Sequence, residues 1–177
     1  MKKVIALIFV LLMLLFSVSG CRSVSQKITE KVVEETVEKA AESEGEDVDV
    51  DYGEDEVTLK TDEGEVTIGK AAELPDGFPG EVPVNSDLQI TTSFKGTSDG
   101  KVNFSVSGTY NGSGEDLFNW YKDKLSGWNV ENEFSADMGD EGKSFSLSAS
   151  SDKYEIGVLI MESEDEATAL ILSVTEK

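Results

Sequence analysis

Residues 101–130 read KVNFSVSGTYNGSGEDLFNWYKDKLSGWNV, and the fold is decided by the change of pattern within them. Apolar and polar side chains alternate through residues 101–110, as they do in a strand with one buried face. Glycines on both sides of Ser113 end the alternation, which is typical of a loop. An apolar stripe with helical spacing then fills residues 114–127, and another strand is expected from Trp128.

The helix expected over residues 114–127 carries its own start and stop signals. Ser113 stands three residues before Asp116, which is close to the spacing of a capping box, and Gly127 is expected to cap the other end. One face of this helix collects the apolar side chains of Leu117, Phe118, Tyr121 and Leu125. The stretch therefore predicts a helix that buries one face against neighbouring strands.

Alternating apolar residues continue on both sides of this stretch. Leu88, Ile90 and Thr92 predict a preceding strand, and an Asp99-Gly100 turn joins it to the next one. Three further strands are expected around residues 145–149, 154–160 and 170–174. Residues 87–177 thus predict an α+β domain, in which an antiparallel sheet of order β-β-α-β-β-β-β carries one helix on a face.

A domain boundary is expected in the Pro-rich connector of residues 74–86. All three prolines of the chain, Pro75, Pro79 and Pro83, fall there with glycines between them. Proline removes a backbone donor and holds the preceding residue extended, which favours an ordered connector over a helix. Its apolar residues indicate that it lies against the domain that follows.

Residues 47–73 predict acidic short strands and a small β-hairpin. Val48, Val50 and Tyr52 alternate with aspartates, which favours a strand with one solvated face. Residues 56–69 alternate on both sides of an Asp-Glu-Gly turn. Because two or three short strands alone are marginally stable, this piece is expected to pack on the next domain or on a partner.

Calcium binding is the alternative for the acidic run. Asp47, Asp49 and Asp51 occupy positions one, three and five of a calcium-loop pattern. Tyr52 then stands where that loop needs glycine, and Thr58 stands where it needs a bidentate glutamate. No metal site is therefore predicted, although binding of cations by residues 46–56 stays open.

The N-terminus has the marks of a secretory signal peptide. Lys2 and Lys3 precede an unbroken apolar run over residues 4–16. As a helix that run would span roughly 20 Å, too short for a hydrocarbon core of about 30 Å, which disfavours the alternative of a retained membrane anchor. Small residues follow at 17–20, immediately before Cys21, the one cysteine of the chain.

Val18-Ser19-Gly20-Cys21 resembles the lipobox of bacterial lipoproteins, which consists of an aliphatic residue, two small residues and cysteine. The resemblance implies cleavage after Gly20, removal of residues 1–20 and a diacylglyceryl group on the Cys21 thiol. Thiolates are nucleophilic enough for such alkylation, and two or more acyl chains hold a protein stably at a membrane. A reduced or disulfide-bonded Cys21 is the alternative, but the chain has no second cysteine. The implied location is the cell membrane or outer membrane, with the domain facing outside the cytoplasm.

Residues 21–46 would then be the lipidated cysteine and a helical stalk. Within them residues 25–43 predict an amphipathic helix with Ser25 as N-cap. Its thin apolar face consists of Ile28, Val32, Val33, Thr36, Val37, Ala40 and Ala41. A stalk that holds the domain away from the membrane is one interpretation, and a partner-binding or self-associating helix is the other.

A second resemblance concerns residues 56–177. The segments LPDGFPGEVPV and FNWYKDKLSGWNV are similar to segments of a class of uncharacterised prokaryotic envelope lipoproteins. The matching residues are Leu74, Pro75, Phe78, Pro79, Val82 and Pro83, followed by Tyr121, Leu125, Gly127 and Trp128. Asn85-Ser86-Asp87 departs from the tyrosine-proline-glycine turn that related chains often carry. The resemblance supports the fold but implies no catalytic residue.

Composition excludes several classes of chemistry. The 36 acidic and 15 basic residues give a net charge of −21, which disfavours nucleic-acid binding. The chain has no histidine, so imidazole bases and zinc-histidine sites are excluded, and no cofactor is predicted. A carboxylate-dependent envelope hydrolase is the alternative function, with Glu131 and Glu133, or Asp137 and Asp140, as candidate acid and base.

Aromatic residues suggest a place for a ligand. Trp120, with Tyr110 or Phe118, is expected either to close the edge of the core or to border a groove for a peptide or glycan. The sequence as a whole predicts a lipid-anchored envelope protein that carries a small non-enzymatic binding or interaction module. The expected partners are the membrane, through the lipid on Cys21, and an unknown envelope protein or glycan.

Overall fold

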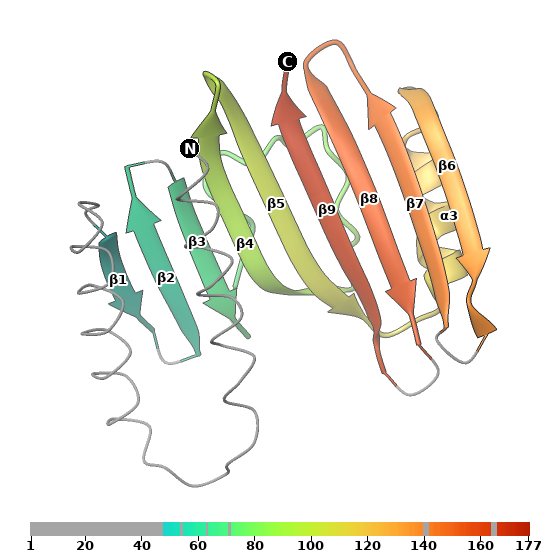
Figure 1. Cartoon of the computed structure of the whole chain (residues 1–177), viewed down its shortest axis with the longest axis horizontal. Coiled ribbons are helices and arrows are strands. Elements are labelled where there is room, and N and C mark those ends of the chain that lie inside the picture. The colour runs from blue at the N-terminus through green and yellow to red at the C-terminus, as the bar shows by residue number, and fades with distance from the viewer. Residues whose placement is uncertain (1–47, 54, 63, 71, 140–141, 164–165) are drawn as a thin grey trace, which may run out of the picture.

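The computed structural model describes residues 48–177 except 54, 63, 71, 140, 141, 164 and 165. Within this part of the chain one antiparallel sheet of nine strands is accompanied by one helix (Figure 1). The elements are β1 (Val48–Tyr52), β2 (Glu56–Thr61), β3 (Gly64–Gly69), β4 (Leu88–Ser98), β5 (Lys101–Tyr110), α3 (Gly114–Lys124), β6 (Asn129–Asp137), β7 (Lys143–Ser150), β8 (Tyr154–Glu162) and β9 (Thr168–Glu176).

The strand order across the sheet is β1-β2-β3-β4-β5-β9-β8-β7-β6. The chain builds the sheet outward from β1 to β5, crosses through α3 to the far edge, and returns strand by strand from β6. β9 comes after all the other described strands in the sequence, and it lies between β5 and β8 in the sheet. Each described pair of neighbouring strands is antiparallel.

Helix α3 begins where the sequence predicts, because its first turn is capped from two directions. The Ser113 hydroxyl accepts a hydrogen bond from the Asp116 amide at 3.1 Å, and the Glu162 carboxylate accepts one from the Gly114 amide. The predicted C-cap is wrong: the helix ends at Lys124 with Leu125 as its C-cap, so Gly127 lies beyond the helix.

The face of the sheet that α3 packs against is called the helix face here, and the opposite one the far face. α3 packs on β7 and β8, and the connector of residues 74–86 runs on the same side across β5 and β9 (Figure 1). The resulting core consists of Val82, Phe104, Leu117, Phe118, Tyr121, Leu125, Phe145, Leu147, Ala149, Ile156, Val158, Ile160, Leu170, Leu172 and Val174.

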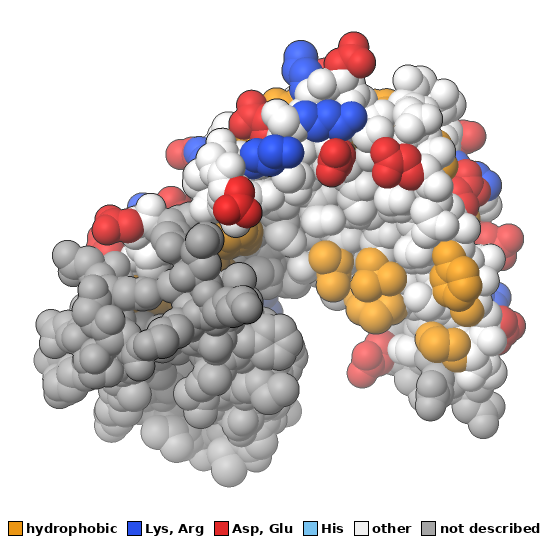
Figure 2. Space-filling model, turned by 45° about the horizontal axis from the view of Figure 1, so that its top comes forward, with side chains coloured by type: hydrophobic (Ala, Val, Ile, Leu, Met, Phe, Trp, Pro, Cys, Tyr) orange, Lys and Arg blue, Asp and Glu red, His pale blue; other side chains and the backbone are white. Residues whose placement is uncertain are grey.

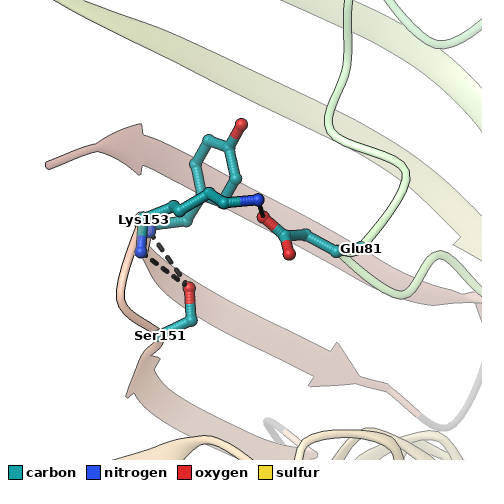
Figure 3. A network of polar contacts seen from close by, with 4 residues as sticks. Glu81, Ser151 and Lys153 are labelled. Atoms are coloured by element: carbon teal, nitrogen blue, oxygen red, sulfur yellow. Dashed lines mark hydrogen bonds and ion pairs between the residues drawn. The ribbon is translucent and has the colours of Figure 1, made fainter.

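The connector is held at several points. The Phe78 ring meets the Phe104 ring edge-on at 5.6 Å between centroids, and Val82 is buried in the core. Near the turn between β7 and β8, Glu81 forms an ion pair with Lys153 at 3.3 Å, while the Ser151 hydroxyl accepts from the Lys153 amide (Figure 3). The connector is therefore an ordered part of the core, as its prolines predict.

The two halves of the sheet have their apolar side chains on opposite faces. In β5, β7, β8 and β9 the buried apolar residues lie on the helix face. The pairing places polar side chains of β1–β3 on that same face, namely Asp49, Asp51, Thr58, Lys60, Glu65 and Thr67. The far face of β1–β4 carries apolar ones instead: Val48, Val50, Tyr52, Val57, Leu59, Val66, Ile68 and Phe94.

The α+β fold class is wrong, since the protein is predominantly β. The hairpin that was expected as a separate piece pairs along β3 with β4, from Gly64 opposite Gly96 to Ile68 opposite Thr92, so β1–β3 extend the main sheet. β3 satisfies the backbone groups that the long strand β4 would otherwise leave at a sheet edge. The expected amphipathic helix at 25–43, the signal peptide with Gly20, and Cys21 lie outside the described residues.

Candidate binding surface

The far face of β6–β9 presents apolar side chains in a surface of hydroxyl groups. Strand pairing aligns Phe134, Ser146, Leu159 and Ile171 side by side across the four strands, and this line is called the apolar row. Phe134 is 55% exposed and Ile171 is 37% exposed. Met161, 42% exposed, lies one step along β8 on the same face.

A line of small polar residues runs beside the apolar row and is called the serine row. It joins Asn132, Ser148, Gly157 and Ser173, which the register places opposite one another on β6–β9. Since these side chains are short and Gly157 has none, the row forms the floor of a shallow groove of about 360 Å³. Leu159 and Ile171 line one side of that groove.

Gly157 keeps the groove floor low. A Cβ at this position would meet the Ser173 hydroxyl at 2.8 Å. The same hydroxyl donates a hydrogen bond to the Gly157 carbonyl at 3.3 Å, which joins β8 and β9 at the centre of the groove. A side chain here would displace the Ser173 hydroxyl and fill part of the groove.

Figure 2 shows how this surface looks to a partner. Hydrophobic side chains form clusters on the part of the face to the right of the grey atoms, while Lys, Arg, Asp and Glu gather along the upper margin. Exposed apolar groups beside hydroxyl donors and acceptors suit a ligand that is partly apolar and makes a few hydrogen bonds. The lining residues of the groove include no titratable side chain.

The predicted aromatic groove involves other parts of the fold. Phe118 is buried with its ring 5.4 Å from that of Phe145, and the Trp120 ring meets Tyr121 edge-on at 4.9 Å. Tyr110, at the end of β5, is half-buried against the core. None of these three residues lines the groove on the far face. A ligand groove at Trp120, Tyr110 and Phe118 remains a prediction.

Tyr121 has a perturbed side-chain titration. Burial raises the pKa of its phenol well above the usual range, and the adjacent backbone of Asn85 offsets this only in part. The hydroxyl is enclosed where α3 meets the connector, without a hydrogen bond of normal geometry among the described groups. Tyr121 is therefore a structural residue that stays neutral in ordinary buffers.

The candidate carboxylates on β6 are occupied by structural contacts. Glu131, at a bulge of β6, accepts a hydrogen bond from the Ser150 hydroxyl at 2.8 Å, and Glu133 forms an ion pair with Lys122 at 2.7 Å. Asp137 accepts from the Gly139 amide at 2.9 Å, while Asp140 lies outside the described residues.

The acidic run is a strand, as its alternation predicts. Asp49 and Asp51 are exposed on β1, while Asp47 lies outside the described residues. In the described part of the chain, acidic and cysteine residues form no group of three or more that could hold a metal ion.

The sequence predicts no groove on this face, although it carries a signal for one. The serines of residues 144–151 alternate with core residues, a pattern that by itself indicates only the outer face of a strand. The runs Val158-Leu159-Ile160-Met161 and Leu170-Ile171-Leu172 break the alternation, because apolar residues occupy both faces there. An unbroken apolar run in an otherwise alternating sheet indicates that its second face also makes apolar contacts.

No family model, no curated protein and no solved structure matches this chain. Within the portion that the structure describes, no helix has the length and apolar character needed to cross a membrane.

Proposed function

We propose that this protein is a lipid-anchored component of the cell envelope that binds an envelope protein or glycan through the far face of β6–β9. The anchor part of the proposal is supported by the signal-like N-terminus and by the resemblance of residues 18–21 to a lipobox. The binding part is supported by the groove between the apolar row and the serine row.

One observation carries the binding part: large apolar side chains are exposed where the core does not need them. Phe134 and Ile171 point away from the core that α3 and the connector cover. Contiguous exposed apolar groups with a polar rim are typical of interaction surfaces. Such groups at the centre of an interface commonly supply most of its binding energy.

A photo-crosslinking residue at position 173 of the full lipoprotein tests the binding surface in intact cells. Ser173 is exposed in the groove, so a bound partner is expected to form an adduct there. Ile171→Ser should lower the adduct yield about tenfold or more, as expected for a central apolar contact.

Leu74→Ser is the matched control for that variant. Leu74 is 41% exposed, close to the 37% of Ile171, but belongs to the connector instead of the far face. Its adduct yield should equal that of the unsubstituted chain. An equal loss in both variants, or no adduct from position 173, would show that the groove is not the binding surface.

The anchor is tested separately with Cys21→Ser. The substitution should abolish incorporation of labelled fatty acid and move the protein from the detergent phase to the aqueous phase, because two acyl chains dominate membrane affinity. Unchanged partitioning would contradict the lipid anchor, but it would not bear on the proposal that the groove binds a partner. Ser19→Ala keeps a small residue in the lipobox pattern and is expected to remain lipidated.

A further inference from the structure

Strand β6 forms one edge of the sheet and is exposed along almost its whole length (Figure 1). Each of its residues except Ala136 is exposed, and Phe134 keeps 55% of its surface accessible. One side of β6 pairs with β7, and among the described residues no strand, turn or loop forms backbone hydrogen bonds with the other side. The outer side of β6 therefore presents a row of N–H and C=O groups that can pair with a further strand.

The regular part of this edge runs from Asn132 to Asp137. The pairing with β7 shifts between Val130 and Asn132, which places Glu131 at a bulge. A bulge bends a strand and ends regular pairing, so it protects that end of the edge against addition of a strand. The six residues beyond the bulge pair regularly with β7, and six residues are an ordinary strand length. A further strand therefore fits beside residues 132–137.

The apolar row reaches the edge of the sheet at Phe134. Pairing places Phe134 beside Ser146 of β7, and Leu159 and Ile171 continue the row across β8 and β9. A strand paired with β6 would extend the row by one side chain, next to the Phe134 ring on the far face. Pairs of an aromatic and a β-branched side chain on neighbouring strands are favourable. The edge of β6 is thus continuous with the candidate binding surface.

The helix face of the same edge carries two acidic side chains. Glu133 lies opposite the buried Leu147, and Asp137, four residues further along β6, shares its face. Each has a lysine on its inner side, since Lys122 forms the ion pair with Glu133 and Lys143 lies opposite Asp137. A carboxylate accepts several hydrogen bonds, so both acids can also contact a cation that arrives from the exposed outer side.

Backbone geometry and charge decide which occupant fits this edge. Another extended polypeptide matches the spacing of backbone donors and acceptors along β6, whereas a glycan has no such repeating pattern. A second copy of the chain would bring its own acidic residues to the edge, and two chains with a net charge of −21 repel each other. A segment with lysine or arginine opposite Glu133 and Asp137 gains favourable cross-strand pairs instead.

We infer that an extended basic segment of a partner protein adds to β6 as a further strand beside residues 132–137. Antiparallel addition, as between all described neighbouring strands, places basic side chains beside Asp137 and Glu133 and an apolar one beside Phe134. The segment then has the pattern basic-x-x-apolar-basic. The inference rests on the proposed function and narrows its partner from a protein or glycan to a basic polypeptide segment.

Peptides of defined sequence test the inference with the full lipoprotein in detergent micelles at low ionic strength. The probe KTTVKT has the inferred pattern, and the control ETTVET carries glutamates in place of both lysines. At millimolar concentration KTTVKT should slow amide exchange of residues 132–137 at least about fivefold, because the outer amides gain hydrogen-bond acceptors. ETTVET should bind about tenfold more weakly, because it brings two like charges to the acidic side chains.

Reversing the charges of the edge provides a matched test. Glu133→Lys with Asp137→Lys should invert the preference, so that ETTVET binds about tenfold more tightly than KTTVKT. Glu73→Lys with Asp76→Lys changes the net charge by the same amount at exposed positions of the connector side. This control should keep the preference for KTTVKT, and an equal response of the two variants would overturn the inference.

The other outcomes also overturn the inference, and they leave the proposed function to its own test. Slowed exchange confined to β8 and β9 would place the peptide in the groove alone. Slowed exchange of residues 132–137 that grows with protein concentration, without peptide, would identify a second copy as the occupant. If neither peptide changes the exchange of β6, no strand adds there, whereas an adduct from position 173 in cells would still support the groove.

Discussion

At the scale of single residues, the N-cap of α3 and the alternation of the strands follow from the sequence, whereas the C-cap of α3 and the enclosure of Tyr121 do not. Ser113 and Asp116 form the predicted helix start, since the side chain and the backbone amide that it caps are three residues apart. Gly127 was predicted as a C-cap from its position alone, but Leu125 already takes that role. The enclosure of Tyr121 depends on the connector, which is more than thirty residues away in sequence, so no local pattern reveals it.

Tyr121 gives a prediction about alkaline pH. An unfolded tyrosine loses its proton near pH 10, whereas burial keeps Tyr121 protonated in the folded chain to a higher pH. Above pH 10 the unfolded state then binds fewer protons than the folded state, so stability falls as pH rises, by up to about 1.4 kcal/mol per pH unit from this group. Below pH 10 the contribution is fully present.

Tyr121→Phe should remove this part of the alkaline loss and change stability at pH 7 by less than about 1 kcal/mol, because the hydroxyl makes no hydrogen bond of normal geometry. Urea unfolding of both proteins between pH 8 and pH 11 measures the difference. Parallel stability curves for the two proteins would refute the assignment.

At the scale of elements, positions of strands follow from the alternation because each strand of the main core has one buried face. The Asp99-Gly100 turn is an example, since both residues have the positive φ that a tight hairpin turn requires. The connector was also recognisable, as proline spacing restricts it to an extended path. The apolar runs of β8 and β9 indicate contacts on a second face, but the groove of β6–β9 itself does not follow from them, because its lining comes from four strands whose register no single segment contains.

The capping of α3 gives a prediction at this scale. Ser113→Ala should lower the free energy of unfolding by about 1 kcal/mol, since the Asp116 amide loses its acceptor at the helix start. Ser126→Ala, at an exposed position beyond the other end of α3, should change it by less than about 0.5 kcal/mol. Denaturant unfolding followed by circular dichroism compares the two, and equal effects would argue against the cap.

At the scale of the whole molecule, the error in fold class has a specific physical origin. The apolar side chains of β3 lie on the far face of the sheet, and those of β5 lie on the helix face. Residues 47–73 therefore resemble a separate piece in the sequence, because nothing in their alternation shows which of their faces continues the buried face of residues 87–177. Backbone pairing does not depend on which face is apolar, so β3 joins β4 although their apolar sides differ from those of β5. The side-chain pattern of a strand predicts which of its faces is buried. It does not predict which strands pair, because pairing is made by backbone hydrogen bonds.

The central place of β9 gives a prediction for the whole chain. Removing residues 168–177 leaves β5 and β8 without the strand that joins them and takes Leu170, Leu172 and Val174 from the core. Each such side chain contributes about 1.5–3 kcal/mol by burial, so the loss approaches the full stability of an ordinary domain. The shortened chain should show no cooperative thermal transition, and a sharp transition near that of the intact protein would contradict this.

The position of β9 also governs the timing of folding. A chain that is being synthesised holds β1–β8 before β9 has emerged, so the two halves of the sheet cannot join until β9 pairs with both of them. This strand order therefore makes completion of the sheet a late event, which waits for the segment that pairs with both β5 and β8. Until that segment is in place, the backbone groups of β5 and β8 that face each other lack their strand partner.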